Sequence, residues 1–135
     1  MRLVSMENST QQPVVLIVED EYLLAYDLAD ALAQANISVL GPVGRVSEAL
    51  FAISRADQLD CALLDISVAG EMIFPVADAL SERGIPFAFT TGFEKSLVEE
   101  RFRDVEVFSK PFNVFRVVDG IRKMAIRYRA ETKRR

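Results

Sequence analysis

The chain contains no histidine among its 135 residues. This absence excludes Ser-His and Cys-His catalytic groups, zinc sites built on histidine, and a role as a phosphohistidine carrier. The single cysteine, Cys61, allows neither an internal disulfide nor a thiolate zinc site. It lies in an apolar run that predicts a buried strand, where a thiol serves as a small core side chain.

Long hydrophobic runs are also missing. No apolar run approaches the ~20 residues that span a bilayer, and the first twelve residues lack the apolar core of a signal peptide. We therefore expect a cytoplasmic protein with no membrane partner. No glycine-rich phosphate loop follows the first apolar run, which disfavours a nucleotide-binding flavodoxin-like protein. With 50% apolar and 27% charged residues, the composition predicts one globular domain.

Charge is distributed unevenly. Residues 121–135 hold seven Lys or Arg and one Glu, a net charge of +6, so the rest of the chain carries −10 of the total of −4. Apolar residues recur among these basic ones at helical spacing, which favours a terminal helix with a solvated basic face. We expect a flexible segment over 1–12, a folded domain over 13–130 and a basic tail over 131–135.

Short apolar runs alternate with longer amphipathic stretches, the pattern of βα units. Five such units in strict alternation predict an α/β fold, a doubly wound parallel sheet of five strands with helices on both faces. The expected strands cover residues 14–18, 37–40, 61–64, 86–90 and 105–109. The expected helices cover 21–35, 75–84, 95–103 and 112–129, and a further helix opens near Ser47 and includes Ile53.

Polar side chains follow four of these strands at the point where each strand ends. Glu19 and Asp20 follow the first strand, Asp65 the third, Thr91 the fourth and Lys110 the fifth. Each of these residues alone is more often a helix cap or a solvated loop residue. Because the carboxyl ends of parallel strands meet at one edge of a sheet, their joint occurrence predicts a site there.

The residue types suit a hard divalent cation and a phosphoryl group. Asp20 and Asp65 would be direct ligands of Mg²⁺ or Mn²⁺, and Glu19 would act directly or through water. An Asp carboxylate forms aspartyl-phosphate intermediates, so Asp65 is the candidate nucleophile. Lys110 would contact a phosphate oxygen as a point charge, and Thr91 would donate its hydroxyl to another.

In these motifs and their order, residues 13–130 resemble a response-regulator receiver domain. The motifs are an acidic pair, an Asp, a Thr and then Lys110-Pro111. The resemblance implies a flavodoxin-like strand order 2-1-3-4-5 and phosphoryl transfer to Asp65 from a histidine kinase or phosphotransfer protein. It also implies that the carbonyl of Ser67 completes the metal site. Residues 89–93 further resemble the Phe-Ala-Thr-Gly signature of a stand-alone receiver subgroup, with Thr90 in place of Ala.

Val107 departs from the receiver pattern, and Phe93 is a notable residue close to the predicted site. Val107 occupies the place of the usual Tyr or Phe switch, so a rotating aromatic ring cannot report phosphorylation from there. Phe93 follows Thr91 by two residues, and we hypothesise that its ring obstructs the attacking water and lengthens the phosphoryl lifetime. Phe108, next to Val107, should point to the opposite face and pack in the core.

The resemblance implies output through the surface of helix 4, strand 5 and helix 5, without a DNA-binding domain. Candidates for exposed apolar side chains on that surface are Leu97, Val98, Phe102 and Phe115. Homodimerisation through the same surface stays open, as do two other functions. One is an interaction module that takes no phosphate. The other is a magnesium-dependent phosphohydrolase, which the serine at Ser67 disfavours because such enzymes carry a second Asp there.

Overall fold

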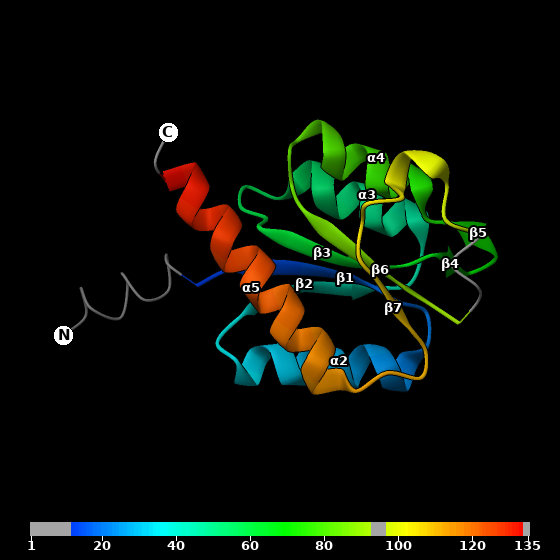
Figure 1. The fold of residues 1–135 in the computed structure, drawn as a ribbon, viewed down its shortest axis with the longest axis horizontal. Helices are drawn as coiled ribbons and strands as arrows, with labels where there is room; N and C mark the ends of the chain where they lie inside the picture. The colour runs from blue at the N-terminus through cyan, green and yellow to red at the C-terminus, as the bar shows by residue number, and fades with distance from the viewer. Residues whose placement is uncertain (1–11, 93–96, 134–135) are drawn as a thin grey trace.

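The computed structural model describes residues 12–92 and 97–133. Its centre is a parallel sheet of five strands in the order β2-β1-β3-β6-β7 (Figure 1). Since β6 and β7 are the fourth and fifth of these strands along the chain, the predicted flavodoxin-like order is confirmed. The strands are β1 (Val14–Val18), β2 (Ser38–Val43), β3 (Cys61–Asp65), β6 (Phe87–Thr91) and β7 (Val107–Ser109).

Four helices cover the two faces of the sheet. Helices α2 (Tyr22–Gln34) and α5 (Val114–Lys133) lie on one face, and α3 (Val46–Arg55) and α4 (Phe74–Glu82) lie on the other (Figure 1). This double covering explains why β3 and β6 are buried at every position and why most of their residues are apolar. No helix in the described part of the chain is long and apolar enough to cross a membrane.

Strand periodicity divides the core into two clusters. Along β1, Leu16 and Val18 pack toward α3 and α4, while Val15 and Ile17 pack toward α2 and α5. Alternate residues of a strand point to opposite faces, so one short apolar run serves both cores. The doubly wound architecture predicted from the alternation of elements is therefore confirmed.

Edge strand β2 is longer than predicted. The sequence Gly41-Pro42 was expected to end the strand at Leu40, but pairing resumes at Val43 after a shift in register. A strand at the edge of a sheet tolerates proline, because the missing N–H faces away from its one neighbour.

The helix predicted over 95–103 is wrong in its described part. From Val98 onward this segment contains the 3₁₀ turn η2 (Glu100–Phe102) and no α-helix. Phe102, expected among the exposed apolar residues, is buried at 6% exposure, and Val98 packs partly against the same core. Leu97 and Phe115 are exposed, as predicted.

Tertiary contacts explain the short turn. The Phe102 ring stacks on Phe74 at 5.7 Å between centroids and meets the edges of Phe87 and Phe89. Arg101 lies over the Phe102 ring and forms an ion pair of 2.9 Å with Asp78 of α4. A segment of this length gains little from helix formation alone, so these contacts set its conformation.

A small antiparallel hairpin, which the sequence pattern did not reveal, follows β3. Its strands are β4 (Ser67–Val68) and β5 (Glu71–Met72). Both residues of its turn, Ala69 (φ 50°) and Gly70 (φ 81°), have positive φ. Turns of this kind favour Asn-Gly or Gly-Gly, so alanine in the first position gave no signal.

Truncating Phe102 should weaken the fold strongly. We expect Phe102→Ala to lower the free energy of unfolding by about 3 kcal/mol or more, because it opens a cavity among packed aromatic rings. Phe115→Ala is the matched control: its ring is 74% exposed, so the change should stay within about 0.5 kcal/mol. Urea unfolding monitored by circular dichroism measures both. Equal effects would contradict the anchoring role of Phe102.

Candidate functional site

The strands deliver the predicted site residues to one edge of the sheet. Glu19 and Asp20 follow β1, Asp65 is the last residue of β3, Thr91 the last of β6, and Lys110 comes directly after β7. Four adjacent parallel strands thus end together. The structure brings Glu19, Asp20 and Asp65 into one cluster, and Lys110 contacts Glu19 and Asp65.

Three carboxylates form a compact cluster at this edge. Oxygen atoms of Glu19, Asp20 and Asp65 lie within 4.8 Å of one another. Glu19 and Asp65 are buried, at 4% and 6% exposure, whereas Asp20 is exposed and accepts a hydrogen bond from the Ala69 amide at 2.8 Å. The unpredicted hairpin therefore holds one wall of the cluster in place.

Lys110 reaches into the acidic cluster. Its Nζ lies 2.9 Å from Glu19 Oε1 and 3.0 Å from Asp65 Oδ2, with Glu21 Oε2 farther away at 3.4 Å. The Lys110 amide donates to the carbonyl of Thr91 at 2.7 Å, which fastens this residue to the end of β6. Glu21 was not predicted as a site residue, because it lies beyond the acidic pair at the start of a helix.

Burial and neighbouring charges shift the pKa values of Glu19 and Lys110. Burial raises the pKa of Glu19 from 4.5 to about 7; hydrogen bonds from Lys110 and the Glu21 amide oppose this shift, and the charge of Asp65 adds to it. Burial lowers the pKa of Lys110, but hydrogen bonds to Glu19 and Asp65 outweigh it and the net direction is upward. Lys110 is therefore charged across the physiological pH range.

The donor set fits a divalent cation. When ionised, the three carboxylates carry two negative charges beyond the one that Lys110 balances, and all their donor atoms are oxygen. Glu19 Oε1 is buried, and among the described residues its close polar contact is the Lys110 ammonium group at 2.9 Å. A cation beside Glu19 and Asp20 would give this atom a second partner and relieve the mutual repulsion of the carboxylates.

The remaining predicted residues lie around the cluster. Ser67 is in β4, and its amide is 3.4 Å from Asp65 Oδ1, while the metal-binding role of its carbonyl stays a prediction. Thr91 is fully buried at the end of β6. Val107 packs on the α3–α4 side of the sheet and Phe108 on the α2–α5 side. Phe93 lies outside the described residues, so its effect on phosphoryl lifetime stays a prediction.

An aromatic surface borders the site and was not predicted. Tyr22 and Tyr26 of α2 are 81% and 63% exposed, and Leu23 between them is 75% exposed. The two tyrosines line a groove of about 470 Å³ that also includes Glu19 and Asp20. The sequence held one signal for this surface. Directly after the acidic pair, Tyr22, Leu23 and Tyr26 occupy helix positions outside the buried stripe that includes Leu28 and Leu32.

Comparisons with known proteins agree with this architecture. No protein-family model matches the chain. The solution structure of SdrG from Sphingomonas melonis Fr1 is similar, with 39% identity and a TM-score of 0.70 over 86% of this chain and 97% of SdrG. SdrG is also known in a BeF3-activated conformation, from Pseudomonas melonis Fr1, with 38% identity and a TM-score of 0.68 over 83% of this chain and 95% of that one.

Two further relatives are more distant. The transcriptional regulatory protein PdtaR of Mycobacterium tuberculosis H37Rv is 28% identical over 87% of this chain, which spans 59% of the length of PdtaR. A CheY-like response regulator receiver domain protein from Methanospirillum hungatei JF-1 shares the fold, with 19% identity and a TM-score of 0.77 over 89% of this chain and 98% of that one.

These relatives and the fold define a class. The chain belongs to the response-regulator receiver family. Membership of this family places the protein in two-component signalling and supports phosphoacceptor signalling as its role. Receiver domains bind Mg²⁺ at an acidic pocket, and Glu19, Asp20 and Asp65 form such a cluster here.

The raised pKa of Glu19 predicts a pH dependence for the metal-free protein. Between about pH 4.5 and pH 7 the native state holds a proton on Glu19 that the unfolded chain has lost. The free energy of unfolding should therefore fall as the pH rises through this window, and Glu19→Gln should lack that fall. Lys110 is charged in both states throughout the window and adds no slope.

Urea unfolding in the presence of a chelator, at several pH values across this window, tests the prediction. The difference between the parent and Glu19→Gln isolates Glu19 from the other titrating groups. Glu21→Gln, which changes an exposed neighbour, should keep the parent's slope. Parallel curves for the parent and Glu19→Gln would mean that Glu19 titrates with its ordinary pKa.

Proposed function

We propose that the protein is a phosphoacceptor switch in which Asp65 receives a phosphoryl group from a histidine kinase or phosphotransfer protein. The observation that carries the proposal is Lys110 Nζ at 3.0 Å from Asp65 Oδ2, inside a cluster of three carboxylates. A structural lysine would need one carboxylate partner, whereas this arrangement provides an excess of negative charge that suits a cation.

The transfer is a displacement at phosphorus. An oxygen of Asp65 forms the new P–O bond, while the P–N bond of the donor phosphohistidine breaks and its electron pair leaves with the imidazole. Lys110 would move from the Asp65 oxygen to an oxygen of the phosphoryl group. Thr91 would donate its hydroxyl to another.

Magnesium fits the remaining part of the site. Glu19, Asp20 and Asp65 would hold the ion with the carbonyl of Ser67, and the bound ion would supply neutralising charge to the phosphoryl oxygens. The raised pKa of Glu19 implies that this carboxyl group loses its proton when the ion binds, so affinity for Mg²⁺ should rise with pH toward about 7 and above.

The partner surfaces follow from the same geometry. We propose that the phosphodonor docks on the exposed aromatic side chains of α2, since Tyr22 and Tyr26 line the groove that borders Glu19 and Asp20. In the proposed transfer the phosphohistidine belongs to the donor, because this chain contains no histidine.

Output would use the surface predicted from the sequence, formed by the segment before β7, β7 itself and α5, with the turn η2 where the fourth helix was expected. Phosphorylation adds negative charge at Asp65, which would draw Thr91 and Lys110 inward and shift the ends of β6 and β7. Val107 offers no aromatic rotation, so the buried ring of Phe102 beside Phe89 is the candidate transmitter. The readout would be the binding of a protein target or onward relay of the phosphate.

Phosphorylation is tested directly by intact-protein mass. After incubation with acetyl phosphate or phosphoramidate and Mg²⁺, the parent should gain the mass of one phosphoryl group, and Asp65→Asn should gain none. Asp27→Asn is the matched control, because Asp27 is an exposed aspartate on α2 outside the acidic cluster. Equal labelling of the parent and Asp65→Asn would reject Asp65 as the acceptor. Beryllium fluoride binding by the parent gives a second readout that does not depend on phosphoryl lifetime.

The metal site has its own test. Asp20→Asn should weaken Mg²⁺ binding at least about tenfold, because it removes one anionic oxygen ligand while keeping the side-chain shape. Glu21→Gln should change the affinity by less than about twofold, since Glu21 is not a member of the cluster. Isothermal titration of both variants and the parent measures these constants. An unchanged affinity in Asp20→Asn would place the metal elsewhere.

A further inference from the structure

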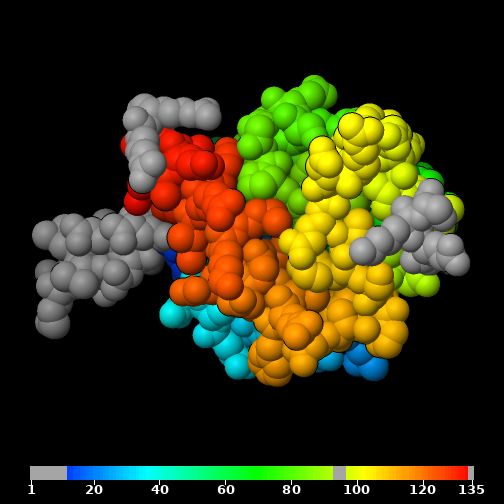
Figure 2. Space-filling view, viewed as in Figure 1, coloured from blue at the N-terminus to red at the C-terminus, as the bar shows by residue number. Residues whose placement is uncertain are grey.

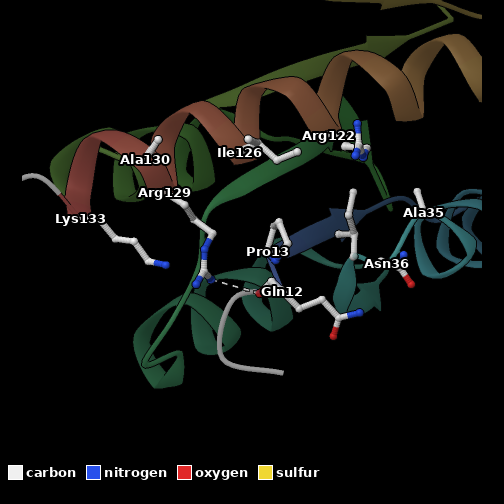
Figure 3. A pocket seen from close by; sticks show the side chains of 10 residues that line it. Gln12, Pro13, Ala35, Asn36, Arg122, Ile126, Arg129, Ala130 and Lys133 are labelled. Atoms are coloured by element: carbon white, nitrogen blue, oxygen red, sulfur yellow. Dashed lines mark hydrogen bonds between the residues drawn. The ribbon is translucent and has the colours of Figure 1, made fainter. Parts of the chain in front are cut away.

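A second hollow lies at the opposite end of the sheet from the acidic cluster. It is a pocket of about 710 Å³ between the C-terminal half of α5, the chain entering β1 and the end of α2 (Figure 3). In the space-filling view α5 crosses the front of the molecule, and most of the outward surface of this helix is exposed (Figure 2). The pocket is lined by Gln12, Pro13, Ala35, Asn36, Ile37, Arg122, Ile126, Arg129, Ala130 and Lys133.

The lining carries positive charge with no carboxylate. Arg122 and Lys133 project from α5 at the two ends of the pocket, with Ile126 between them (Figure 3). Neither cation forms an ion pair in the part of the chain that the structure describes. Within the described residues they therefore present about two uncompensated positive charges to a ligand that enters the pocket.

Arg129 has a different role, because the buried carboxylate of Asp60 balances its charge. Its Nη1 lies 3.4 Å from Asp60 Oδ2 and donates to the Gln12 carbonyl at 3.1 Å. Asp60 is buried and also accepts hydrogen bonds from the backbone amide of Val14 and from the side-chain amide of Gln58. This network ties α5 to the start of β1 and gives the pocket a fixed floor, which lowers the cost of ordering it on binding.

Apolar and amide groups occupy the rest of the lining. Ile126 is 42% exposed although it is a large aliphatic side chain, and Pro13, Ala35 and Ala130 extend the apolar surface around it. Gln12 and Asn36 add side-chain amides at the rim. A fitting ligand therefore combines carboxylates with an aliphatic side chain, which is the chemistry of an acidic protein segment. A nucleic acid fits less well, because the remainder of the chain carries a net charge of −10.

We propose that this basic pocket is a docking site for an acidic segment of a partner protein, with carboxylates on Arg122 and Lys133 and an aliphatic side chain against Ile126. It lies at the amino ends of the strands, whereas Asp65 lies at their carboxyl ends, so docking leaves the phosphoacceptor site accessible. The proposal is independent of the function proposed above.

The test uses the full chain, isotope-labelled for NMR, and a synthetic acetylated heptapeptide that alternates pairs of Asp or Glu with Leu. Amide shifts should map to Gln12, Asn36, Ile126 and Lys133, and the affinity should fall with added salt. The same peptide with Asn and Gln in place of its acids should not bind. Reversing both charges, in Arg122→Glu with Lys133→Glu, should weaken binding about tenfold or more.

The matched control is Arg127→Glu with Lys123→Glu, which makes the same charge change on exposed positions of α5 outside the pocket. Equal weakening by both double variants would reduce the pocket to a general basic surface and overturn the proposal.

Peptide binding seen only after removal of residues 1–11 would assign the pocket to the chain's own N-terminus. Shifts that grow with protein concentration alone would assign it to a second copy, and the absence of shifts would reject it. Circular dichroism of each variant checks that its fold is intact.

Discussion

The contact of Lys110 with Asp65 and Glu19 is the constraint around which the functional edge is organised. Two buried carboxylates side by side would repel each other, and one of them would have to take up a proton. One ammonium group placed 2.9 Å and 3.0 Å from their oxygens offsets part of this repulsion. Burial nevertheless holds the pKa of Glu19 above its usual value, and the charge of Asp65 adds to this shift.

The same lysine is held by the backbone of its neighbours. Its amide bonds to the Thr91 carbonyl, so the end of β7 cannot move without the end of β6. The rings of Phe87 and Phe89, on β6 itself, pack with those of Phe74 and Phe102 on one face of the sheet. A shift at Thr91 would reach the η2 turn through Phe89 and Phe102 by direct contact, without an aromatic side chain at position 107. A packed aromatic cluster transmits such a shift well because close-packed side chains do not deform independently.

The two ends of the sheet carry opposite charge. The carboxyl ends of the strands gather Glu19, Asp20 and Asp65, while the amino ends lie beneath the basic half of α5. Asp60 is a carboxylate at the otherwise basic amino end of the sheet, and it balances the charge of Arg129 in the pocket lining. This separation keeps the acidic cluster and the basic pocket at opposite ends of the sheet, so that they do not form ion pairs with each other.

Local sequence determined much of this protein. Short apolar runs set the strands, since a strand buried on both faces must be apolar throughout. Their alternation with amphipathic stretches set the doubly wound sheet. The order of polar residues at strand ends placed Glu19, Asp20, Asp65 and Lys110 together, because parallel strands that end at one edge leave no other arrangement.

Only the tertiary structure decided the remaining features, since each depends on contacts between distant residues. Phe102 is buried and its turn is short because rings from β6 and α4 surround it, and no local pattern encodes those partners. The hairpin that bonds Asp20 turns on an alanine with positive φ, which local preference opposes. The basic pocket joins residues from both ends of the described chain, and packing of α5 against the sheet is the physical reason that they meet.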